Sequence, residues 1–384
     1  MAALGHLPEE VMIEILSRLP PESLLRFKTV RKSWYALIND PKFATIYFSN
    51  SPHQQKHILV KRLVTKNSGK QENIFSFLNF PLPFDGSVPV YDVDLPSDED
   101  LRYSQICGHS HGLLCLTDLG TDIFLCNPAT REFQKLPRSI LLLTEPPTEP
   151  DGYDSSTNAV GFGYDSKSKD FKVVRVVDFM EGVCHFYPSR VEIYDLSKDR
   201  WREIETPICG SVFWMPSFEM YHEGTYYWWA KTGEGEEIIQ SFDMSEEVFG
   251  RISMPESFKR GDRMYRSMGV LNGSIVLFHY PSEEGEKEFE IWEMEKDEFG
   301  GVSWSKLLTI GPLFGIGKPL VFVGSNELLM ESIEGQVVLY NTRTKQLREL
   351  PMKGNPEEFQ ATQATVFVEG LVSVKGGNNL KYEI

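Results

Sequence analysis

One short phrase recurs along this chain and limits the folds that the chain can adopt. An apolar strand ends in Asn, Asp or Glu, a turn of three to five residues follows, and a second strand often closes with Leu-Pro or Met-Pro. The polar residues that mark the copies are Asn127, Asp195, Asp243, Glu293 and Asn341, which are 68, 48, 50 and 48 residues apart. The long first step contains an insertion rich in Pro, Ser and Thr near residues 144–157. Without the insertion the period is close to 50, which is the spacing of β-propeller blades, each a four-stranded sheet.

Further strands complete each repeat. Apolar runs such as "HGLLCL", "GTYYWWA" and "GSIVLFHY" lie upstream of the phrases. The five marked repeats, together with unmarked strands at 57–64 and 73–80, predict about six blades. The C-terminal strand "ATVFVEGLVSV", around 365–374, is expected to pair beside the strand at 57–64, because a closed ring hides the sheet edges that a half-ring exposes.

The first 50 residues have a different pattern. In "LPEEVMIEILSRLPPESLLRFKTVRKSW" a first helix starts at Pro8 and ends at Leu19, and a second begins at Pro21. A third is expected to end before Pro41. Three short helices cannot bury this much apolar surface among themselves. The excess either docks on the rest of the chain or binds another protein.

The charge of the chain is uneven. The net charge is −16, and the first 50 residues hold six basic and five acidic side chains, which leaves 33 basic and 50 acidic, a net −17, for the remainder. Such acidity excludes nucleic acid and anionic membranes as expected partners and favours a basic protein. Acidity that only maintains solubility is the open alternative. Acidic segments lie at 92–100, 234–237 and 282–290, and Glu234, Glu236 and Glu237 are the candidate substrate contacts.

No apolar run approaches 18 residues, and the N-terminal segment lacks the features of a signal peptide. We therefore expect a cytoplasmic protein, with the nucleus as the alternative. The odd number of cysteines favours free thiols in a reducing compartment. They are Cys107, Cys115, Cys126, Cys184 and Cys209.

Few residue groups suggest chemistry. Cys107, His109 and His111 would share one face of an extended strand near Cys115, a set of zinc-ligand types. Structural zinc sites usually use two separated ligand pairs, so a buried strand without metal or cofactor is expected instead. A catalytic Cys115 would need an activating neighbour, and His111 would lie about 13 Å away along a strand. The aromatic run at 226–229 is expected to fill the core between blades rather than a sugar or base site.

The N-terminal segment resembles an F-box over its whole length. The pattern Leu-Pro, Ile-Leu-x-Arg-Leu-Pro, Ser-Leu-Leu-Arg-Phe-Lys, Lys-Ser-Trp and Pro-x-Phe occurs here in order. The resemblance implies binding to the Skp-type adaptor of cullin–RING ubiquitin ligases, which would use the surplus apolar surface. The implied adaptor contacts are Leu7, Pro8, Ile15, Leu16, Leu19, Leu24, Phe27 and Trp34. Some of these must instead hold the helices together, and the sequence leaves open which.

The rest of the chain resembles the F-box-associated domain of plant F-box proteins. The phrases "LCNPATREFQKLP", "GFGYDSKSKDFKVVRVV" and "EIYDLSKDRWREI" carry this resemblance. The ordered set from Phe124 to Phe322 is similar to the S-locus F-box proteins of self-incompatible plants. In that family the pollen protein recognises pistil S-ribonucleases, which are generally basic, and directs their ubiquitination.

The predicted fold is therefore mainly β with a small N-terminal α module: a three-helix F-box at 1–50 and a β-propeller-like domain of about six blades at 51–384. We expect a non-catalytic substrate-recognition subunit of an SCF-type ubiquitin ligase, with an S-ribonuclease as the implied substrate. One alternative is a plant F-box protein with an unrelated protein substrate. Another is a propeller enzyme with an N-terminal docking module, which would need carboxylates or metal ligands converging at the ring centre.

Overall fold

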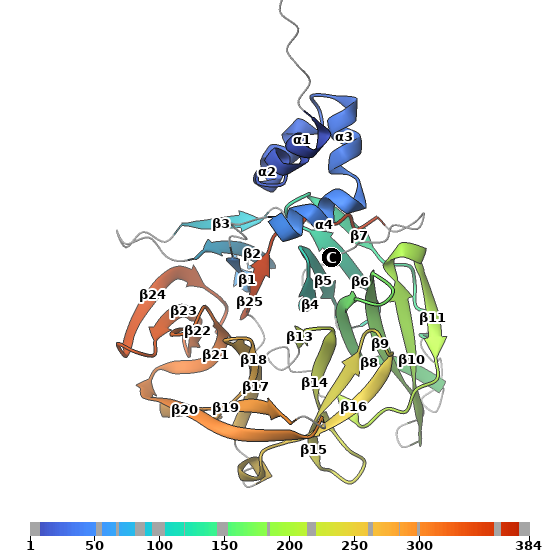
Figure 1. Ribbon diagram of the computed structural model, residues 1–384. Helices are drawn as coiled ribbons and strands as arrows, with labels where there is room; N and C mark the ends of the chain where they lie inside the picture. The colour runs from blue at the N-terminus through green and yellow to red at the C-terminus, as the bar shows by residue number, and fades with distance from the viewer. Residues whose placement is uncertain are drawn as a thin grey trace, which may run out of the picture.

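A small helical module is followed by six β-sheets arranged around an axis in the computed structural model of this chain (Figure 1). This arrangement confirms the predicted fold class. The described residues are 8–50, 56–66, 69–80, 89–93, 104–118, 120–143, 153–182, 185–212, 220–259, 264–283, 285–297, 300–356 and 362–375.

The helical module contains the three expected helices and a fourth. Their bounds are α1 Glu9–Leu16, α2 Pro21–Phe27, α3 Lys32–Ile38 and α4 Pro41–Asn50. The sequence predicts no helix after Pro41, because a proline at that position indicates the end of the preceding helix. In the structure Pro41 is the first residue of α4, a position that tolerates proline. The preceding Asp40 accepts a hydrogen bond from the backbone of Lys42 at 2.8 Å, as a capping residue does.

Each blade is an antiparallel sheet, and blade 4 carries one extra short strand. Blade 1 contains β1 Lys56–Thr65, β2 Gln71–Asn79, β3 Val90–Val93 and β25 Thr362–Val368. Blade 2 contains β4 Gln105–Ser110, β5 Leu113–Thr117, β6 Ile123–Asn127 and β7 Glu132–Lys135. Blade 3 contains β8 Tyr153–Asp165, β9 Asp170–Glu181, β10 His185–Asp195 and β11 Arg200–Ile204. Blade 4 contains β12 Ser211–Val212, β13 Met220–His222, β14 Thr225–Lys231, β15 Glu237–Asp243 and β16 Val248–Ser253. Blade 5 contains β17 Met264–Leu271, β18 Ser274–Pro281, β19 Glu286–Lys296 and β20 Val302–Phe314. Blade 6 contains β21 Ile316–Phe322, β22 Glu327–Ser332, β23 Gln336–Asn341 and β24 Gln346–Lys353.

The ring closes through the last strand. β25 pairs antiparallel with β1, with Ile58 opposite Val366, and becomes the innermost strand of blade 1. This confirms the predicted pairing, although β25 ends at Val368 and the residues after it leave the sheet. Closure therefore pairs the inner edge of β1, which would otherwise be exposed.

The repeated polar residue starts a turn in three of the blades. The Oδ1 atom of Asn127 accepts hydrogen bonds from the backbone of Ala129 and Thr130 at 3.0 and 3.1 Å, and Asn341 and Asp243 act in the same way. Glu293 was the wrong marker, because it lies inside β19. The turn of blade 5 instead begins at Asp297, which accepts a hydrogen bond from the backbone of Gly301 at 2.6 Å.

Aromatic side chains fill the space between blades 3 and 4. Tyr226 and Trp228 are completely buried, which confirms the core assignment of this run. The rings lie so close to β8 that only glycine fits opposite them. A Cβ atom on Gly161 would lie 2.6 Å from Cζ2 of Trp228, and one on Gly163 would lie 2.3 Å from Cε2 of Tyr221.

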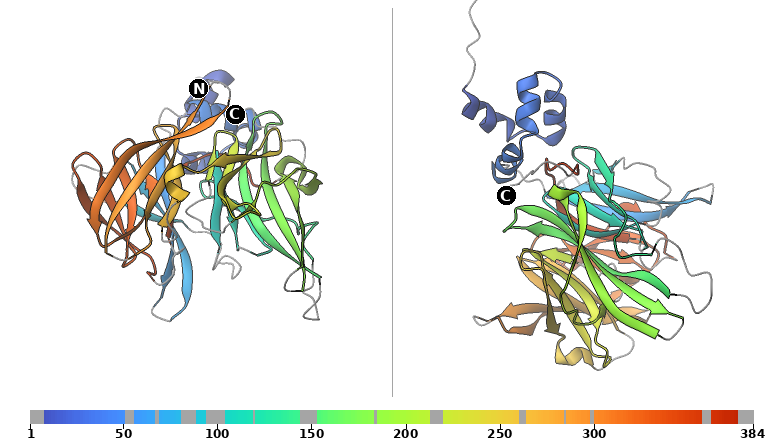
Figure 2. Two further views of the ribbon diagram at one scale, coloured as in Figure 1. Left: turned by 90° about the horizontal axis from the view of Figure 1, so that it is seen from below. Right: turned by 90° about the vertical axis from the view of Figure 1, so that its right-hand side faces the viewer.

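The two rims of the ring differ in what they carry. We count the strands of each blade outwards from the ring axis. Because neighbouring strands are antiparallel, the turns that join the first strand to the second and the third to the fourth lie at one rim. The second-to-third turns and the connections between blades lie at the other. The helical module lies against the first rim (Figure 2), which we call the module rim; the opposite one is the far rim. Among the described residues, no helix is long and apolar enough to cross a membrane.

Candidate functional site

Two of the positions implied for adaptor contact lie in the interior of the helical module. Leu16 and Leu24 are 2% and 0% exposed, and they belong to one cluster with Ile38 of α3 and Phe43 of α4. They hold the helices together. A polar substitution at either position would act first on the fold of the module.

Three other implied positions lie at the edge of this core. Leu19, Phe27 and Trp34 are half-buried. The rings of Phe27 and Trp34 meet edge to face with centroids 5.2 Å apart, and Nε1 of Trp34 lies 2.9 Å from Sδ of Met12. These side chains join the internal core to the surface of the module.

The remaining implied positions are exposed or undescribed. Pro8 is exposed and Ile15 is 49% exposed, while Leu7 lies outside the described residues. Val11 of α1 is 42% exposed and precedes Ile15 by four residues, so both side chains lie on one helix face. Val30 is a further exposed apolar residue of the module, at 58%. The structure thus leaves an apolar surface that the propeller does not cover.

Helix α4 joins the module to the propeller. Tyr47 is buried in the cluster that contains Leu371 and Val372 from the C-terminal segment and Leu113 from blade 2. The C-terminal segment is itself fixed to blade 2. Nδ2 of Asn127 donates hydrogen bonds to the carbonyls of Gly370 and Val372 at 3.0 and 2.7 Å. The module is therefore mounted on packed side chains and hydrogen-bonded backbone rather than on a single linker.

Ionisable groups are buried at this junction. Burial raises the pKa of the Glu369 carboxyl to about 7, and the nearby charge of Glu22 on α2 adds to the effect. Nε2 of His57 lies 3.7 Å from the Glu369 carboxylate. Burial lowers the pKa of His57, although a 2.7 Å hydrogen bond between its Nδ1 and Oδ1 of Asn79 opposes this. Burial and the charges of Glu369 and Glu22 raise the pKa of Tyr47.

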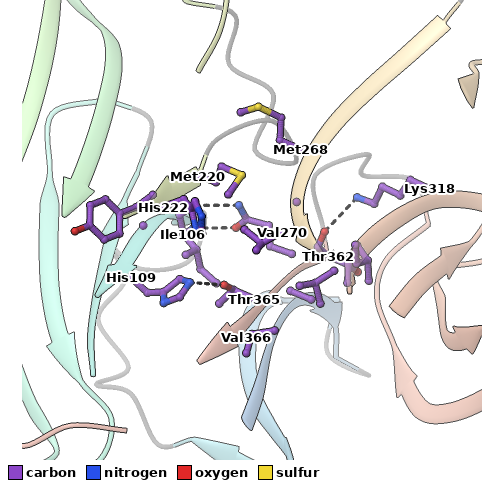
Figure 3. Close-up of a pocket in the computed structure, with 17 residues that line it drawn as sticks. Ile106, His109, Met220, His222, Met268, Val270, Lys318, Thr362, Thr365 and Val366 are labelled. Atoms are coloured by element: carbon purple, nitrogen blue, oxygen red, sulfur yellow. Dashed lines mark hydrogen bonds between the residues drawn. The ribbon is translucent and has the colours of Figure 1, made fainter. Parts of the chain in front are cut away.

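A cavity of about 240 Å³ lies at the ring axis, lined by residues of β4, β13, β17, β21 and β25 (Figure 3). Nε2 of His109 lies 2.6 Å from Oγ1 of Thr365, and Nζ of Lys318 donates to the carbonyl of Thr362 at 3.1 Å. Burial lowers the pKa of His109 to about 4, so its imidazole is neutral near pH 7. Asp and Glu do not occur among the residues that line the cavity in the described structure. The carboxylate pair that the enzyme alternative requires is thus not among them.

The interpretation of residues 107–115 as one extended strand was wrong. β4 ends at Ser110, a turn at His111 and Gly112 follows with φ of 51° and 86°, and β5 begins at Leu113. The hairpin brings Sγ of Cys107 to 3.2 Å from Sγ of Cys115, and both are buried free thiols.

The ring of His111 lies 4.9 Å from that of Tyr164, in an aromatic contact. Within the described ranges no three His, Cys, Asp or Glu side chains gather as metal ligands would, and Cys184 lies outside those ranges.

The three candidate substrate contacts lie on the far rim, at the turn between β14 and β15. Glu234 is exposed. Glu236 pairs with Arg251 at 2.5 Å, and Glu237 pairs with the buried Arg266 at 3.0 Å. Two of the three charges are therefore locally compensated. The acidic segment at 282–290 lies on the same rim, while residues 94–100 of the first acidic segment lie outside the described residues.

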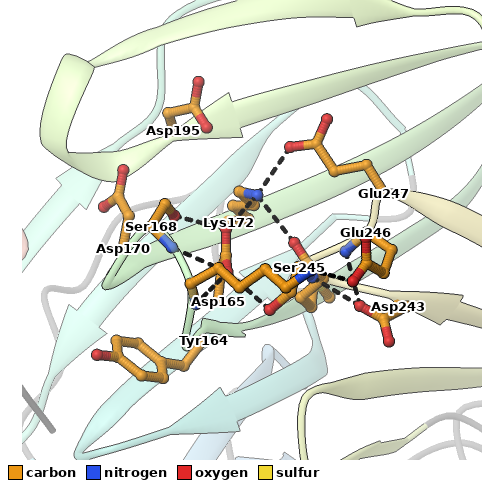
Figure 4. Close-up of polar contacts among 12 residues, drawn as sticks. Tyr164, Asp165, Ser168, Asp170, Lys172, Asp195, Asp243, Ser245, Glu246 and Glu247 are labelled. Carbon is orange, nitrogen blue, oxygen red and sulfur yellow. Dashed lines mark hydrogen bonds and ion pairs between the residues drawn. The ribbon is translucent and has the colours of Figure 1, made fainter.

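A polar network between blades 3 and 4 was not predicted. Nζ of Lys172 lies 2.5 Å from Oδ2 of Asp165, 2.7 Å from Oε1 of Glu247 and 2.8 Å from the carbonyl of Met244 (Figure 4). Burial disfavours the charged Asp165, but hydrogen bonds from Lys172, Ser168 and Ser245 outweigh it and hold its pKa below the usual range. The sequence contains these residues in two separate repeats, so spacing alone gave no signal of their contact.

Comparison with known proteins agrees with this architecture. The family model for the F-box associated beta propeller domain matches residues 81–372, and an F-box-like model matches residues 4–49. The F-box protein CPR1 of Arabidopsis thaliana is 27% identical, with 99% of this chain and 92% of that protein covered. Two F-box/kelch-repeat proteins of the same plant are 30% and 28% identical, with 88% and 79% of this chain and 88% and 75% of those proteins covered. This chain therefore belongs to the family of F-box proteins that carry an F-box associated β-propeller domain.

Proposed function

We propose that this chain is the substrate-recognition subunit of an SCF-type cullin–RING ubiquitin ligase. The helical module binds the Skp-type adaptor, and the propeller binds a protein substrate. The observation that carries the proposal is the exposure of the apolar side chains Val11, Ile15 and Val30 on a module that α4 fixes to the propeller. The family membership supports the same assignment.

In this role the chain itself performs no bond chemistry. It holds a substrate close to the ubiquitin carrier on the other subunits, which raises the effective concentration of substrate lysines there. The orientation of the module relative to the propeller decides where those lysines lie. Asn127, which holds the carbonyls of Gly370 and Val372 under the module, is therefore a positioning residue in this proposal.

We propose further that the substrate is a basic protein, with an S-ribonuclease as the class implied by the resemblance to S-locus F-box proteins. The net charge of −17 beyond residue 50 supports a basic partner. The exposed Glu234 on the far rim would speed its association. The relatives described above are named as F-box or F-box/kelch-repeat proteins, and an unrelated protein substrate is the second candidate.

Two measurements test the proposal. Full-length chain co-expressed with a Skp-type adaptor is expected to elute as one complex, and separate elution would contradict the ligase role. For the substrate, surface-based kinetics with a purified S-ribonuclease at low and physiological salt should show an on-rate that falls with salt. Replacing Glu234, Glu236 and Glu237 by Gln should lower that on-rate. An on-rate indifferent to salt and to these substitutions would remove the electrostatic part of the proposal, and no binding would leave an unrelated substrate.

A further inference from the structure

An apolar corner with carboxylates around it lies on the far rim, where blades 5 and 6 meet. Phe314, the last residue of β20, is 81% exposed, and Ile333 in the turn between β22 and β23 is 45% exposed. The backbone of Ile333 donates a hydrogen bond to the carbonyl of Gly315 at 3.0 Å, so the two side chains project from adjacent backbone. Isolated exposed apolar residues are common, but two that project from adjacent backbone form a small surface of their own.

Three exposed carboxylates border these side chains. Glu286 is the cross-strand partner of Phe314, and Glu288 follows it on the same face of β19. Glu334 follows Ile333 in the turn and is also exposed. We call this set the Phe314 patch: Phe314, Ile333, Glu286, Glu288 and Glu334.

The lysines next to the patch in sequence are buried. Lys287 is 4% exposed, and its Nζ donates to the carbonyl of Gly317 at 3.2 Å. Lys318 is also 4% exposed and pairs with Glu331 at 3.2 Å. An exposed lysine, Lys353, lies on β24 opposite Gln336, beyond the turn that carries Glu334. The patch thus presents an aromatic ring and negative charge together.

We infer that the Phe314 patch binds a segment of the substrate protein that is rich in Arg or Lys. A cation is the group that both parts of the patch attract: the face of an aromatic ring binds Arg or Lys through its quadrupole, and carboxylates bind the same groups through charge-assisted hydrogen bonds. The inference rests on the proposed function and specifies the part of the propeller that such a substrate touches. The patch lies on the far rim, opposite the module rim, so a bound adaptor on the helical module would leave it open.

The experiment uses full-length chain in complex with its adaptor and two fluorescent peptides of equal length. The peptides share their apolar residues and differ only in carrying Arg or Glu at alternate positions. Fluorescence anisotropy should show binding of the Arg peptide and none of the Glu peptide. Phe314→Ser should weaken binding of the Arg peptide about fivefold, the loss of one exposed cation–ring contact. The double variant Glu286→Gln, Glu288→Gln should weaken it and reduce its salt dependence.

A matched control is available on β24, the outer strand of blade 6. Leu347 is 44% exposed on β24 next to Arg348, so Leu347→Ser removes an exposed apolar side chain in a basic setting and should leave peptide binding unchanged. The inference is overturned if the Arg peptide does not bind, if Phe314→Ser binds it as wild type does, or if the Glu peptide binds equally well. Adaptor co-purification is read separately: its failure in wild type counts against the ligase role, while the peptide result decides the patch.

Discussion

The side-chain amide of Gln363 forms two hydrogen bonds with the backbone of Ile106. Its Oε1 accepts from the Ile106 N–H at 2.8 Å, and its Nε2 donates to the Ile106 carbonyl at 3.2 Å. Gln363 lies in β25 and Ile106 in β4, the innermost strands of the first and second blades. The contact therefore exists only when the last strand of the chain has closed the ring.

Removing this amide should destabilise the propeller. Gln363→Leu leaves the N–H and carbonyl of Ile106 without their side-chain partner in a buried site, which costs about 2–4 kcal/mol of the free energy of unfolding. Urea denaturation followed by tryptophan fluorescence measures the change. Gln346→Leu, at an exposed position of β24, is the control and should have little effect. Equal stability of the Gln363 variant and wild type would show that ring closure does not depend on this contact.

Lys172 should couple strongly to Asp165. Lys172→Met leaves two carboxylates, Asp165 and Glu247, without their shared cation, and should lower the free energy of unfolding by about 3–5 kcal/mol. The double variant Lys172→Met, Asp165→Asn should lose less than the sum of the two single variants, because the second substitution removes a buried charge. Simple additivity in a urea double-mutant cycle would contradict the network described between blades 3 and 4.

The junction below the helical module should make stability depend on pH. The pKa of Glu369 is about 7 in the folded chain and about 4.5 in the unfolded chain, so the folded state favours the protonated carboxyl. Between these values the unfolded state has released a proton that the folded state still holds. The free energy of unfolding therefore falls as the pH rises from about 4.5 to about 7, and the loss is complete above pH 7.

Glu369→Gln should remove that dependence. At pH 8 the variant should be more stable than wild type by about 2 kcal/mol, and near pH 5 the two should converge. Above about pH 7.5 His57 is neutral in both states and adds no slope there. Urea titrations at pH 5, 6, 7 and 8 measure the profile, with the exposed Glu349→Gln as control. Parallel profiles for wild type and Glu369→Gln would contradict the assignment of the pH dependence to this carboxyl.

Repetition in the sequence was sufficient to predict the ring. The spacing of Asn127, Asp243 and Asn341 predicted the blades, because each residue starts a turn by bonding its own backbone. Local signals with two meanings were less reliable. Proline can end one helix or begin the next, so the sequence pattern did not predict that α4 begins at Pro41. A glycine inside an apolar run did not reveal the hairpin at Gly112, where φ is 86°.

The candidate site could be predicted only in part, since a helix pattern does not distinguish an inner apolar face from a binding face. Leu16 and Leu24 fit the F-box pattern as well as Ile15 does, yet the structure buries the first two and exposes the third. Contacts between repeats, such as that of Lys172 with Glu247, depend on how blades pack and leave no periodic trace in the sequence. The Phe314 patch is likewise visible only once β19, β20 and the turn after β22 are placed together.

This difference between buried and exposed positions predicts two kinds of F-box variant. Leu16→Asp or Leu24→Asp places a charge in the core of the module, which costs several kcal/mol, so adaptor binding should be lost together with helical structure. The propeller should remain folded in both variants. Circular dichroism and limited proteolysis report the two effects, and an intact module in Leu24→Asp would contradict the burial described.

The most direct test of the ligase role is co-purification of a Skp-type adaptor with the full-length Ile15→Asp variant. Ile15 is 49% exposed, so the substitution should leave the helices folded while placing a charge in the adaptor contact. Ile140→Asp, 56% exposed on the connection between blades 2 and 3, is the matched control. The account predicts that wild type and Ile140→Asp retain the adaptor and that Ile15→Asp, with unchanged circular dichroism, loses it. Undiminished adaptor binding by Ile15→Asp, or none by wild type, would contradict the account.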